Sequence, residues 1–371
     1  PYVVQPKEII PGIANYYATT IGNGYDFANV LIKSREGRPI KVEKNKLAPD
    51  SKSANARVHA SILDLYDNAR LAQPTKDNMP ISWFGFEYET KSELEKISAS
   101  NKEIILLTQT FASPSTKSLI EEFKSNYKNV KHITYDSFSE SAALNAYESR
   151  YGVRGLSNYD FSESKVIVSI GADFLGDWQG GGFDCSYAKG RIPDNGIMSR
   201  HFQFESNMTL SGANADVRVP LKLNEQKLVL IEIYKSVVGN KIQLKSDISL
   251  NKKTKKIVDA LIREIKSAAD GSVVISGIKD EDYQSLVLEI NEELNSYSFN
   301  PSKTIFTRSS DDEKISKLIS SMSNGDVGAL IMSGVNPISV SYTHLRAHET
   351  GRNLGCRLLL EKKKGGGGGG G

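Results

Sequence analysis

Cysteine is scarce in this chain of 371 residues, which has only Cys185 and Cys356. Two cysteines do not form a disulfide framework, and no CxxC pair indicates a zinc or redox site. His59, His132 and His201 are scattered, and none has a partner at metal-ligand spacing. We therefore expect these three histidines to be surface residues or hydrogen-bonded structural ones.

Long hydrophobic runs are missing as well. No stretch approaches the roughly 18 consecutive apolar residues of a membrane span, and the longest candidate, KLVLIEIY from Lys227, has the length of a strand. No secretory signal is present, and because the chain begins at Pro1 rather than Met, we expect any leader to have been lost. With 39% hydrophobic and 25% charged residues, the composition is that of a soluble globular protein with roughly two to three domains.

Common catalytic and phosphate-binding motifs are also lacking. No P-loop or nucleophile elbow occurs, and GNG at Gly22–Gly24 opens no helix, so it is not a dinucleotide fingerprint. SDDEK at Ser310–Lys314 indicates the first turn of a helix rather than a paired-carboxylate site. The run Gly180–Gly182 predicts a mobile loop. A stand-alone nucleotide-binding module would need a phosphate-cradling glycine loop, which we do not find.

The end of the chain has no feature of a folded segment. GRNLGCRLLLEKKK carries no turn or capping signal and runs into Gly365–Gly371, a stretch that is costly to order. VSYTHLRAHET at 340–350 resembles the translation of a transposase-type adapter used in short-read DNA sequencing, and LGCRLLLE is close to its continuation. We therefore expect 340–371 to be a non-native tail without packing against the body, and the native sequence to stop, truncated, near Ser339.

An excess of positive charge disappears when this tail is set aside. The whole chain has a net charge of +3, but the tail holds six basic and two acidic residues, so 41 basic and 42 acidic residues remain, a net charge of −1. This removes the weak indication of a nucleic-acid partner.

The first 80 residues predict a small β segment and one helix. ANVLIK and PIKVE, joined by SREGR, have the alternation of a β-hairpin. NARVHASILDLYDNARL follows, with Val58, Ile62, Leu65 and Ala69 at the spacing of an amphipathic helix. AQPTKDNMP then marks a boundary.

From Ile81 onward, predicted helices and buried strands alternate. SELEKISAS, SPSTKSLIEEFKSNY, SESAALNAYESRYG, NKKTKKIVDALIREIKSAA, DYQSLVLEINEELN and EKISKLISSMS predict helices, and KEIILLTQT, VKHITYD, SKVIVSIGADFL, SVVISG, KTIFTR and VGALIMSG predict strands. Continuous apolar strands between amphipathic helices indicate parallel sheets covered on both faces. The fold class is therefore α/β, with doubly wound, mostly parallel sheets.

Ligands in such sheets sit at the carboxyl ends of strands, where three segments attract attention. They are SIGADFLGDW (Ser169–Trp178), SGANADVRVPL (Ser211–Leu221) and LIMSGVNP (Leu330–Pro337). Small residues after a strand let backbone amides approach a phosphate or a pterin. Gly171 and Gly334 are equally explained as residues of tight turns.

The order of these segments resembles the molybdopterin oxidoreductase superfamily. Its members have a small N-terminal β segment, an "LY..dRl..P" element, and two interleaved α/β domains with "G.NP"-like and "..AD..l"-like strand ends. The matching segments here are LDLYDNARLAQP (Leu63–Pro74), GADF (Gly171–Phe174), NADVRVPL (Asn214–Leu221) and GVNP (Gly334–Pro337). The resemblance marks Gly171, Asp173, Asp216, Gly334, Asn336 and Pro337 as inherited pterin-loop positions.

A narrower resemblance is to the large periplasmic subunit of alternative complex III, a bacterial quinol:cytochrome c oxidoreductase. It rests on PYVVQPKEIIPGIANYYATT, ANARVHASILDLYDNARL and GADFLGDW, and it spans Pro1 to Ile338. That subunit joins a molybdopterin-oxidoreductase-like half to a ferredoxin-like half that carries iron–sulfur clusters. We expect an N-terminal segment over 1–80, a discontinuous first α/β domain over 81–136 and 237–339, and an inserted α/β domain over 137–236.

The sequence departs from active superfamily members at the positions that would bind metal. YYATTIGNGYDFANVLIK holds no cysteine, although a [4Fe–4S] cluster needs about four thiolates. Cys185 follows GADF, whereas the molybdenum ligand precedes the first pterin loop, so we expect Cys185 to be a buried or partly buried small residue. Asp136, Ser137, Ser139 and Ser141 lie in roughly the right place, but Asp and Ser are common in loops and caps.

The resemblance thus implies a cofactor-free, non-catalytic half of an electron-transfer subunit. Phe174, Leu175 and Trp178 follow the first pterin loop and are expected to fill the cleft there. The implied location is the periplasm, the implied partners are a membrane quinol-oxidising subunit and c-type haem subunits, and iron–sulfur clusters are expected in the other half. The alternative is an active molybdopterin-dependent oxidoreductase with an unusual ligand set.

Overall fold

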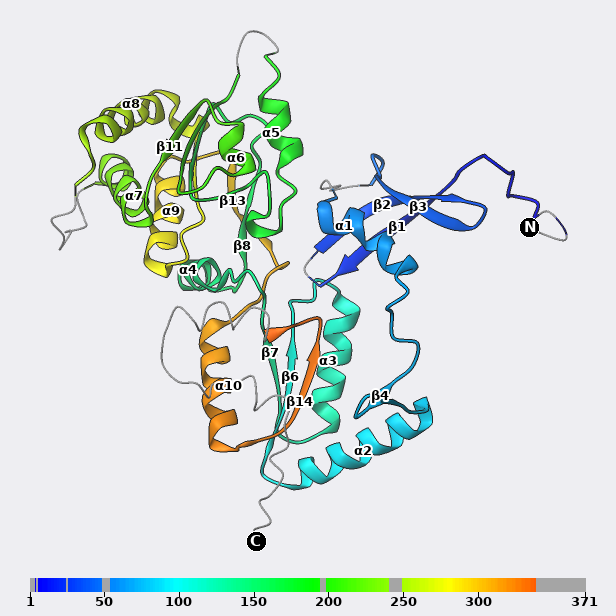
Figure 1. Ribbon diagram of the computed structural model, residues 1–371. Coiled ribbons are helices and arrows are strands. Elements are labelled where there is room, and N and C mark those ends of the chain that lie inside the picture. Colours follow the sequence, from blue (N-terminus) through cyan, green and yellow to red (C-terminus); the bar gives the residue numbers. More distant parts are fainter. Residues whose placement is uncertain are drawn as a thin grey trace, which may run out of the picture. The chain divides into compact units, whose positions relative to one another are not determined.

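The computed structural model describes residue 4 and residues 6–24, 26–48, 54–193, 198–239 and 249–337. The chain forms two compact units, one made of Pro1–Tyr66 and Glu140–Ser309, the other of Asp67–Ser139 and the residues from Ser310 onward (Figure 1). The predicted non-native tail, 340–371, lies outside the described residues. Within the described ranges, no helix combines the length and apolar character that crossing a membrane requires.

The first unit begins with the predicted hairpin, which has a third strand beside it. β1 (Asn15–Asn23), β2 (Asp26–Arg35) and β3 (Arg38–Lys44) form an antiparallel sheet in that order. Glu36 and Gly37 turn the hairpin with φ of 48° and 77°, the left-handed conformation of a tight two-residue turn.

The helix expected after this sheet is shorter than its apolar spacing predicts. α1 spans Ala56–Ala60, and the chain then tightens into a 3₁₀ turn over Ser61–Tyr66. Val58 is buried, whereas Leu65 is 54% exposed. The apolar stripe therefore loses its packing partner after Ile62, and packing is what stabilises most helices of this length.

A four-stranded parallel sheet forms the core of the first unit. Its strands are β9 (Val166–Ile170), β10 (Arg200–Glu205), β11 (Val217–Pro220) and β12 (Ser272–Ser276), in the order β11-β10-β9-β12. The surrounding helices are α4 (Ser141–Tyr151), α5 (Asp184–Gly190), α6 (Leu210–Ala213), α7 (Leu223–Val237), α8 (Lys252–Ala268) and α9 (Glu281–Glu293). The predicted α/β class with mostly parallel sheets is confirmed.

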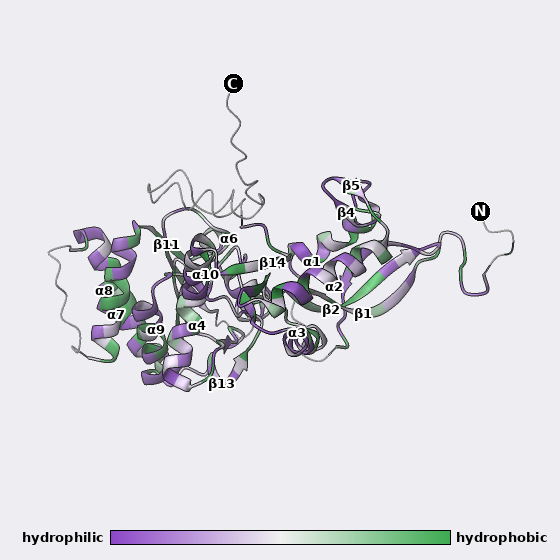
Figure 2. Cartoon of the chain, turned by 90° about the horizontal axis from the view of Figure 1, so that it is seen from below, coloured by the Kyte–Doolittle hydropathy of each residue, from purple (hydrophilic) through white to green (hydrophobic). Residues whose placement is uncertain are grey.

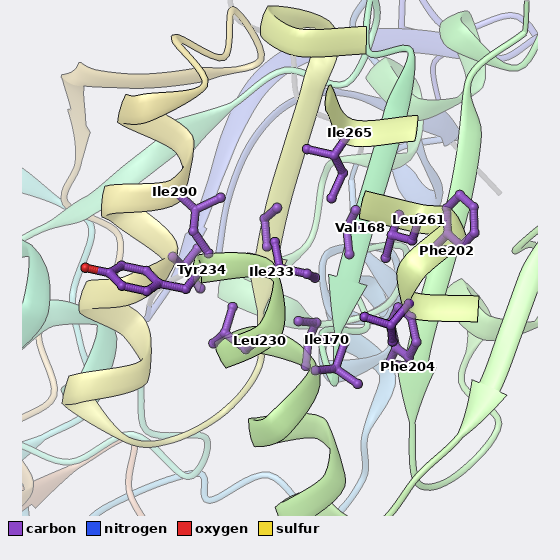
Figure 3. Packing of buried hydrophobic residues seen from close by; sticks show 14 of the residues in the cluster. Val168, Ile170, Phe202, Phe204, Leu230, Ile233, Tyr234, Leu261, Ile265 and Ile290 are labelled. Carbon is purple, nitrogen blue, oxygen red and sulfur yellow. The ribbon is translucent and has the colours of Figure 1, made fainter. Parts of the chain in front are cut away.

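Alternate residues of β9 enter two different apolar clusters, as expected for a sheet covered on both faces. Val168 and Ile170 pack against α7, α8 and α9 (Figure 3), and Ile167 belongs to a cluster rich in aromatic rings. Figure 2 shows hydrophobic and hydrophilic residues sharing α8, whose buried stripe includes Val258 and Leu261.

The apolar run KLVLIEIY is a helix rather than a strand. It lies within α7, where Leu230, Ile233 and Tyr234 are buried against the sheet and neighbouring helices (Figure 3). A helix covered on several sides loses its polar face, so its sequence cannot be told from a buried strand by periodicity.

The second unit repeats the parallel arrangement on a smaller scale. Its three-stranded sheet has the order β14-β6-β7, from β6 (Glu103–Thr108), β7 (Val130–Thr134) and β14 (Val327–Ser333). Its other elements are the hairpin β4 (Thr75–Lys76) and β5 (Met79–Pro80), and the helices α2 (Trp83–Ala99), α3 (Pro114–Asn126) and α10 (Asp312–Asn324). Asp311 caps α10 by accepting from the Lys314 amide at 3.0 Å, so the predicted helix start is confirmed.

The division of the chain differs from the predicted domains. Segment 237–309 stays with the first unit, because β12 pairs with β9 and because α8 and α9 pack on the same sheet. The predicted strand KTIFTR overlaps β13 (Phe299–Ile305), which pairs antiparallel with β8 (Leu156–Tyr159) in that unit. The chain returns to the second unit at Ser310 rather than at 237.

Candidate functional site

The strand order of the first unit reverses between β9 and β12. β9, β10 and β11 follow one another outward on one side, and β12 is added on the other side of β9. In open parallel sheets, ligands bind in the crevice outside the carboxyl ends of the two strands at this switch point. Gly171 directly follows β9, so this predicted position lies at the expected place.

The two backbones approach closely at this switch point, although Gly171 itself is exposed. The Gly277 amide, just after β12, donates to the Ile170 carbonyl at 2.9 Å. A Cβ atom on Gly277 would overlap the Gly171 carbonyl oxygen, and one on Gly171 would lie 2.7 Å from Gln226 Oε1. The two glycines therefore permit close packing of protein on protein.

Aromatic side chains occupy the space beside these glycines. Phe174 is fully buried and contacts Phe161 and Tyr187, with ring centroids 4.9 and 5.5 Å away. Trp178 is 7% exposed and donates from its indole nitrogen to the Ser276 carbonyl at the end of β12, at 3.1 Å. Leu175 is partly buried against the same cluster. These side chains belong to the aromatic cluster that packs on one face of the parallel sheet, together with Ile167 and Ile275.

Asp173 is held by the protein itself. Its Oδ1 accepts hydrogen bonds from the Ser211 amide at 2.9 Å and from the Ser211 hydroxyl at 2.8 Å. The side chain fixes the start of α6 to the loop after β9. Asp173 is thus a structural acceptor in this fold.

Asp216 lies at the amino ends of the strands, whereas Gly171 lies at the carboxyl ends. Its interpretation as a residue of a carboxyl-end loop was therefore wrong. It precedes β11, and its amide donates to the carbonyl of His201 at the start of β10. Its carboxylate accepts from Arg191 Nη1 and from the His201 amide, both at 2.7 Å. Burial raises the pKa of Asp216, but the hydrogen bonds from Arg191 and His201 outweigh it, leaving the pKa below its ordinary value.

The remaining predicted positions belong to the second unit. Gly334 follows β14 with φ of 66°, and a Cβ atom there would overlap the Gln109 side chain, which follows β6. The Gln109 amide donates to the Ser333 carbonyl at 3.3 Å. Asn336 is exposed and Pro337 is half-buried. At this switch point, between β6 and β14, the Gln109 side chain thus lies beside Gly334, which is itself exposed.

The candidate metal-ligand stretch before the first pterin loop is largely engaged in hydrogen bonds. Asp136 is buried and accepts from the Thr110 amide at 2.8 Å and the Thr110 hydroxyl at 2.6 Å. Ser139 donates to the Asp312 carboxylate at 2.8 Å. Ser141 is buried in the first turn of α4, and Ser137 is exposed. Across the described ranges, no three His, Cys, Asp or Glu side chains form a group that could hold a metal ion.

Glu205, at the carboxyl end of β10 in the first unit, is a buried polar residue that was not predicted from the sequence. It ends β10, is 2% exposed, and accepts from Arg218 Nε at 2.5 Å and Thr209 Oγ1 at 2.6 Å. Burial raises the pKa of Glu205, but the hydrogen bonds from Thr209 and Arg218 lower it by more, so the pKa stays below its ordinary value. The signal in the sequence that could have identified it is an acidic residue at the end of a buried strand.

His201 is fully buried between Tyr187 and Gln203. Its Nδ1 lies 3.3 Å from the Tyr187 hydroxyl and its Nε2 lies 3.1 Å from Gln203 Oε1. Burial lowers the pKa of His201 to about 4. His132 is half-buried beside Thr108 Oγ1, at 2.8 Å, and burial lowers its pKa too, whereas His59 is exposed.

Acidification should destabilise the protein through His201. In the unfolded chain a histidine gains its proton near pH 6.5, whereas His201 in the folded protein stays neutral down to about pH 4. The free energy of unfolding should therefore fall by about 3 kcal/mol between these two pH values from this group alone. Urea titrations across this range should show a flatter pH dependence for His201→Gln than for the wild type. His59→Gln is the control, and parallel curves for His201→Gln and wild type would contradict the assignment.

One pocket of about 610 Å³ lies elsewhere in the first unit, between the antiparallel sheet and the loop before α5. None of the predicted pterin-loop residues lines it. Cys185 does, and it is half-buried, as expected of a partly buried small residue. Lys44 Nζ lies 3.2 Å from Cys185 Sγ.

The acidic residues at these strand ends are engaged by the protein itself, and thiolates are scarce. At the switch point of the first unit Gly171 and Gly277 approach closely, Trp178 donates to the end of β12, and Asp173 accepts hydrogen bonds from Ser211. Cys185 alone cannot supply the roughly four thiolates of a [4Fe–4S] cluster, and Cys356 lies outside the described residues.

No family model matches the chain, and no curated protein sequence matches it. Among solved structures, acetylene hydratase from Pelobacter acetylenicus aligns over 73% of this chain and 42% of its own, at 12% identity and a TM-score of 0.49. A chain of the formyltransferase/hydrolase complex from Methylorubrum extorquens, bound to methylofuran, aligns over 71% of this chain and 61% of its own, at 14% identity and a TM-score of 0.34. The chain thus spans less than half of the first protein and less than two thirds of the second. The activities named for these proteins are their own.

Proposed function

We propose that this chain is the cofactor-free, molybdopterin-oxidoreductase-like part of the large periplasmic subunit of a quinol:cytochrome c oxidoreductase, alternative complex III. In this role it is a non-catalytic scaffold for an iron–sulfur half. Electrons from a membrane quinol-oxidising subunit would pass through that half to c-type haem subunits. The resemblance of the sequence motifs supports this role.

The side chains that pack beside the switch point of the first unit support the proposal. An active pterin enzyme needs polar groups that converge on an open crevice at the strand ends. Here Trp178 bonds across to the end of β12, and Asp173 is used by Ser211. In this proposal the parallel sheet contributes a rigid body whose surface binds partners, since a fold by itself does not supply catalytic chemistry.

An exposed aromatic patch on the second unit is suited to such binding. Trp83, Phe84 and Tyr88, in the first turns of α2, are 62%, 79% and 69% exposed. Large exposed apolar groups that lie together mark interaction surfaces, and Trp and Tyr are enriched among residues that dominate binding. We assign this aromatic patch to contact with a partner subunit.

The double variant Trp83→Ala, Phe84→Ala should lose its partners without losing stability. Affinity-tagged protein in its native host is expected to co-purify with c-type haem, measured by the reduced-minus-oxidised absorbance spectrum. Two interface anchors contribute about 2 kcal/mol or more each, so the haem recovered should fall more than tenfold in the variant. Phe138→Ala is the matched control, since Phe138 is 63% exposed outside the patch. Equal haem in all three proteins, or none with wild type, would contradict the proposed role.

A further inference from the structure

The pocket of the first unit combines lysines from three separate elements. Lys44 comes from β3, Lys189 from α5 and Lys303 from β13. Its volume of about 610 Å³ falls within the usual range for small-molecule sites. Residues distant in sequence thus converge on one cavity with several cationic groups.

The two carboxylates of the pocket wall already have donors. Asp26 is 4% exposed and accepts from Arg57 Nε at 2.6 Å, Arg57 Nη2 at 2.9 Å and Asn55 Nδ2 at 2.7 Å. Asp160 accepts from the Ser162 amide at 3.0 Å. The lysines therefore outnumber the acids, and the most buried acid is neutralised by an arginine of its own.

The sulfur of Cys185 is a weak hydrogen-bond partner for the ammonium group of Lys44. A thiol sulfur is a poor acceptor, whereas a ligand oxygen with negative charge forms a charge-assisted hydrogen bond with an ammonium. At 3.2 Å from the sulfur, Lys44 Nζ already lies at the pocket wall. An entering oxyanion would offer it a better partner.

Three consecutive glycines form another wall. Gly180, Gly181 and Gly182 have φ of 95°, 75° and 89°, a region that residues with side chains rarely adopt. Their bare backbone lets a ligand approach closely. Arg308, which is 2% exposed, lies behind them, since a Cβ on Gly180 would be 3.6 Å from its Nη2. The buried guanidinium adds fixed positive charge to this wall.

We propose that this pocket binds a small oxyanion of the phosphate class, either free or as the phosphate group of a small ester. The lysines and the arginine supply charge, and the glycine wall supplies close backbone approach. Three lysines against two carboxylates that already have donors suit the pocket to an anion rather than to a cation. This inference does not depend on the proposed electron-transfer role.

Isothermal titration with inorganic phosphate, pyrophosphate and glycerol phosphate, at low and matched ionic strength, tests the proposal on the full chain. Binding is expected at millimolar concentration or below, and each of Lys44→Met and Lys189→Met should weaken it about tenfold. Lys266→Met, an exposed lysine of α8, is the matched control and should bind as wild type. A preference for glycerol phosphate would identify an ester, and a preference for inorganic phosphate a free anion.

Lys189→Met keeps the test decisive if Lys44→Met fails to fold, since Lys189 is exposed. Circular dichroism establishes that each variant is folded. Absence of binding to wild type at millimolar concentration, or equal affinity in wild type, the two pocket variants and the control, would overturn the proposal.

Discussion

Gly277→Ala should destabilise the first unit by about 3 kcal/mol or more, an effect at the upper end of overpacking penalties. The new Cβ atom would overlap the Gly171 carbonyl oxygen, which is part of the backbone and cannot rotate away. Because Gly277 and Gly171 follow β12 and β9, the strands would have to separate at their carboxyl ends. The same substitution at a glycine with free space should cost little.

Trp178 fluorescence in a Trp83→Phe background measures this effect, because the chain has only two tryptophans and Trp178 belongs to the first unit. Urea denaturation then gives the free energy of unfolding of that unit. Gly22→Ala is the control, since no atom lies within 4 Å of the Cβ position there. A Gly277→Ala protein within about 0.5 kcal/mol of wild type would show that the two backbones are not in contact.

Phe174→Ala should cost about 3–5 kcal/mol, the usual penalty for removing a fully buried phenylalanine. Phe174 is 0% exposed, and its ring lies 4.9 Å from that of Phe161 and 5.1 Å from that of His201, between centroids. The large value follows from the loss of buried area together with the cavity that remains. A ligand-lining residue facing an open crevice would cost far less.

The same fluorescence assay applies to this variant. Phe306→Ala is the matched control, because Phe306 belongs to the same unit and is 52% exposed. We expect the control to lose less than about 1 kcal/mol. Equal losses in the two variants would mean that Phe174 is not part of a packed core.

Local sequence signals predicted most elements of both parallel sheets. The helix ending at Gly152 and the helix capped by Asp311 are found as predicted, because capping and left-handed glycines are local properties. The run from Lys227 was assigned to no element, because its environment, not its periodicity, makes it a helix. The segment 237–309 was misplaced because strand order depends on pairing between distant residues, here β12 with β9.

The candidate site was predictable in part. Gly171 and Gly334 were expected at strand ends and are found there, since small residues after an apolar strand are a local signal. Asp216 lies at the amino ends of the strands because β11 begins at Val217, directly after it, and runs parallel to β10. The close approach of Gly277 to Gly171 joins residues about a hundred positions apart, which no local pattern indicates.

Metal analysis of the full chain tests the central claim most directly. The protein would be purified anaerobically from a host that makes both molybdopterin and iron–sulfur clusters, then examined by elemental analysis and absorbance spectroscopy. We predict a colourless, folded protein with molybdenum and iron far below one equivalent per chain. Stoichiometric molybdenum, or an iron–sulfur absorbance band that is lost in Cys185→Ser, would contradict the cofactor-free account.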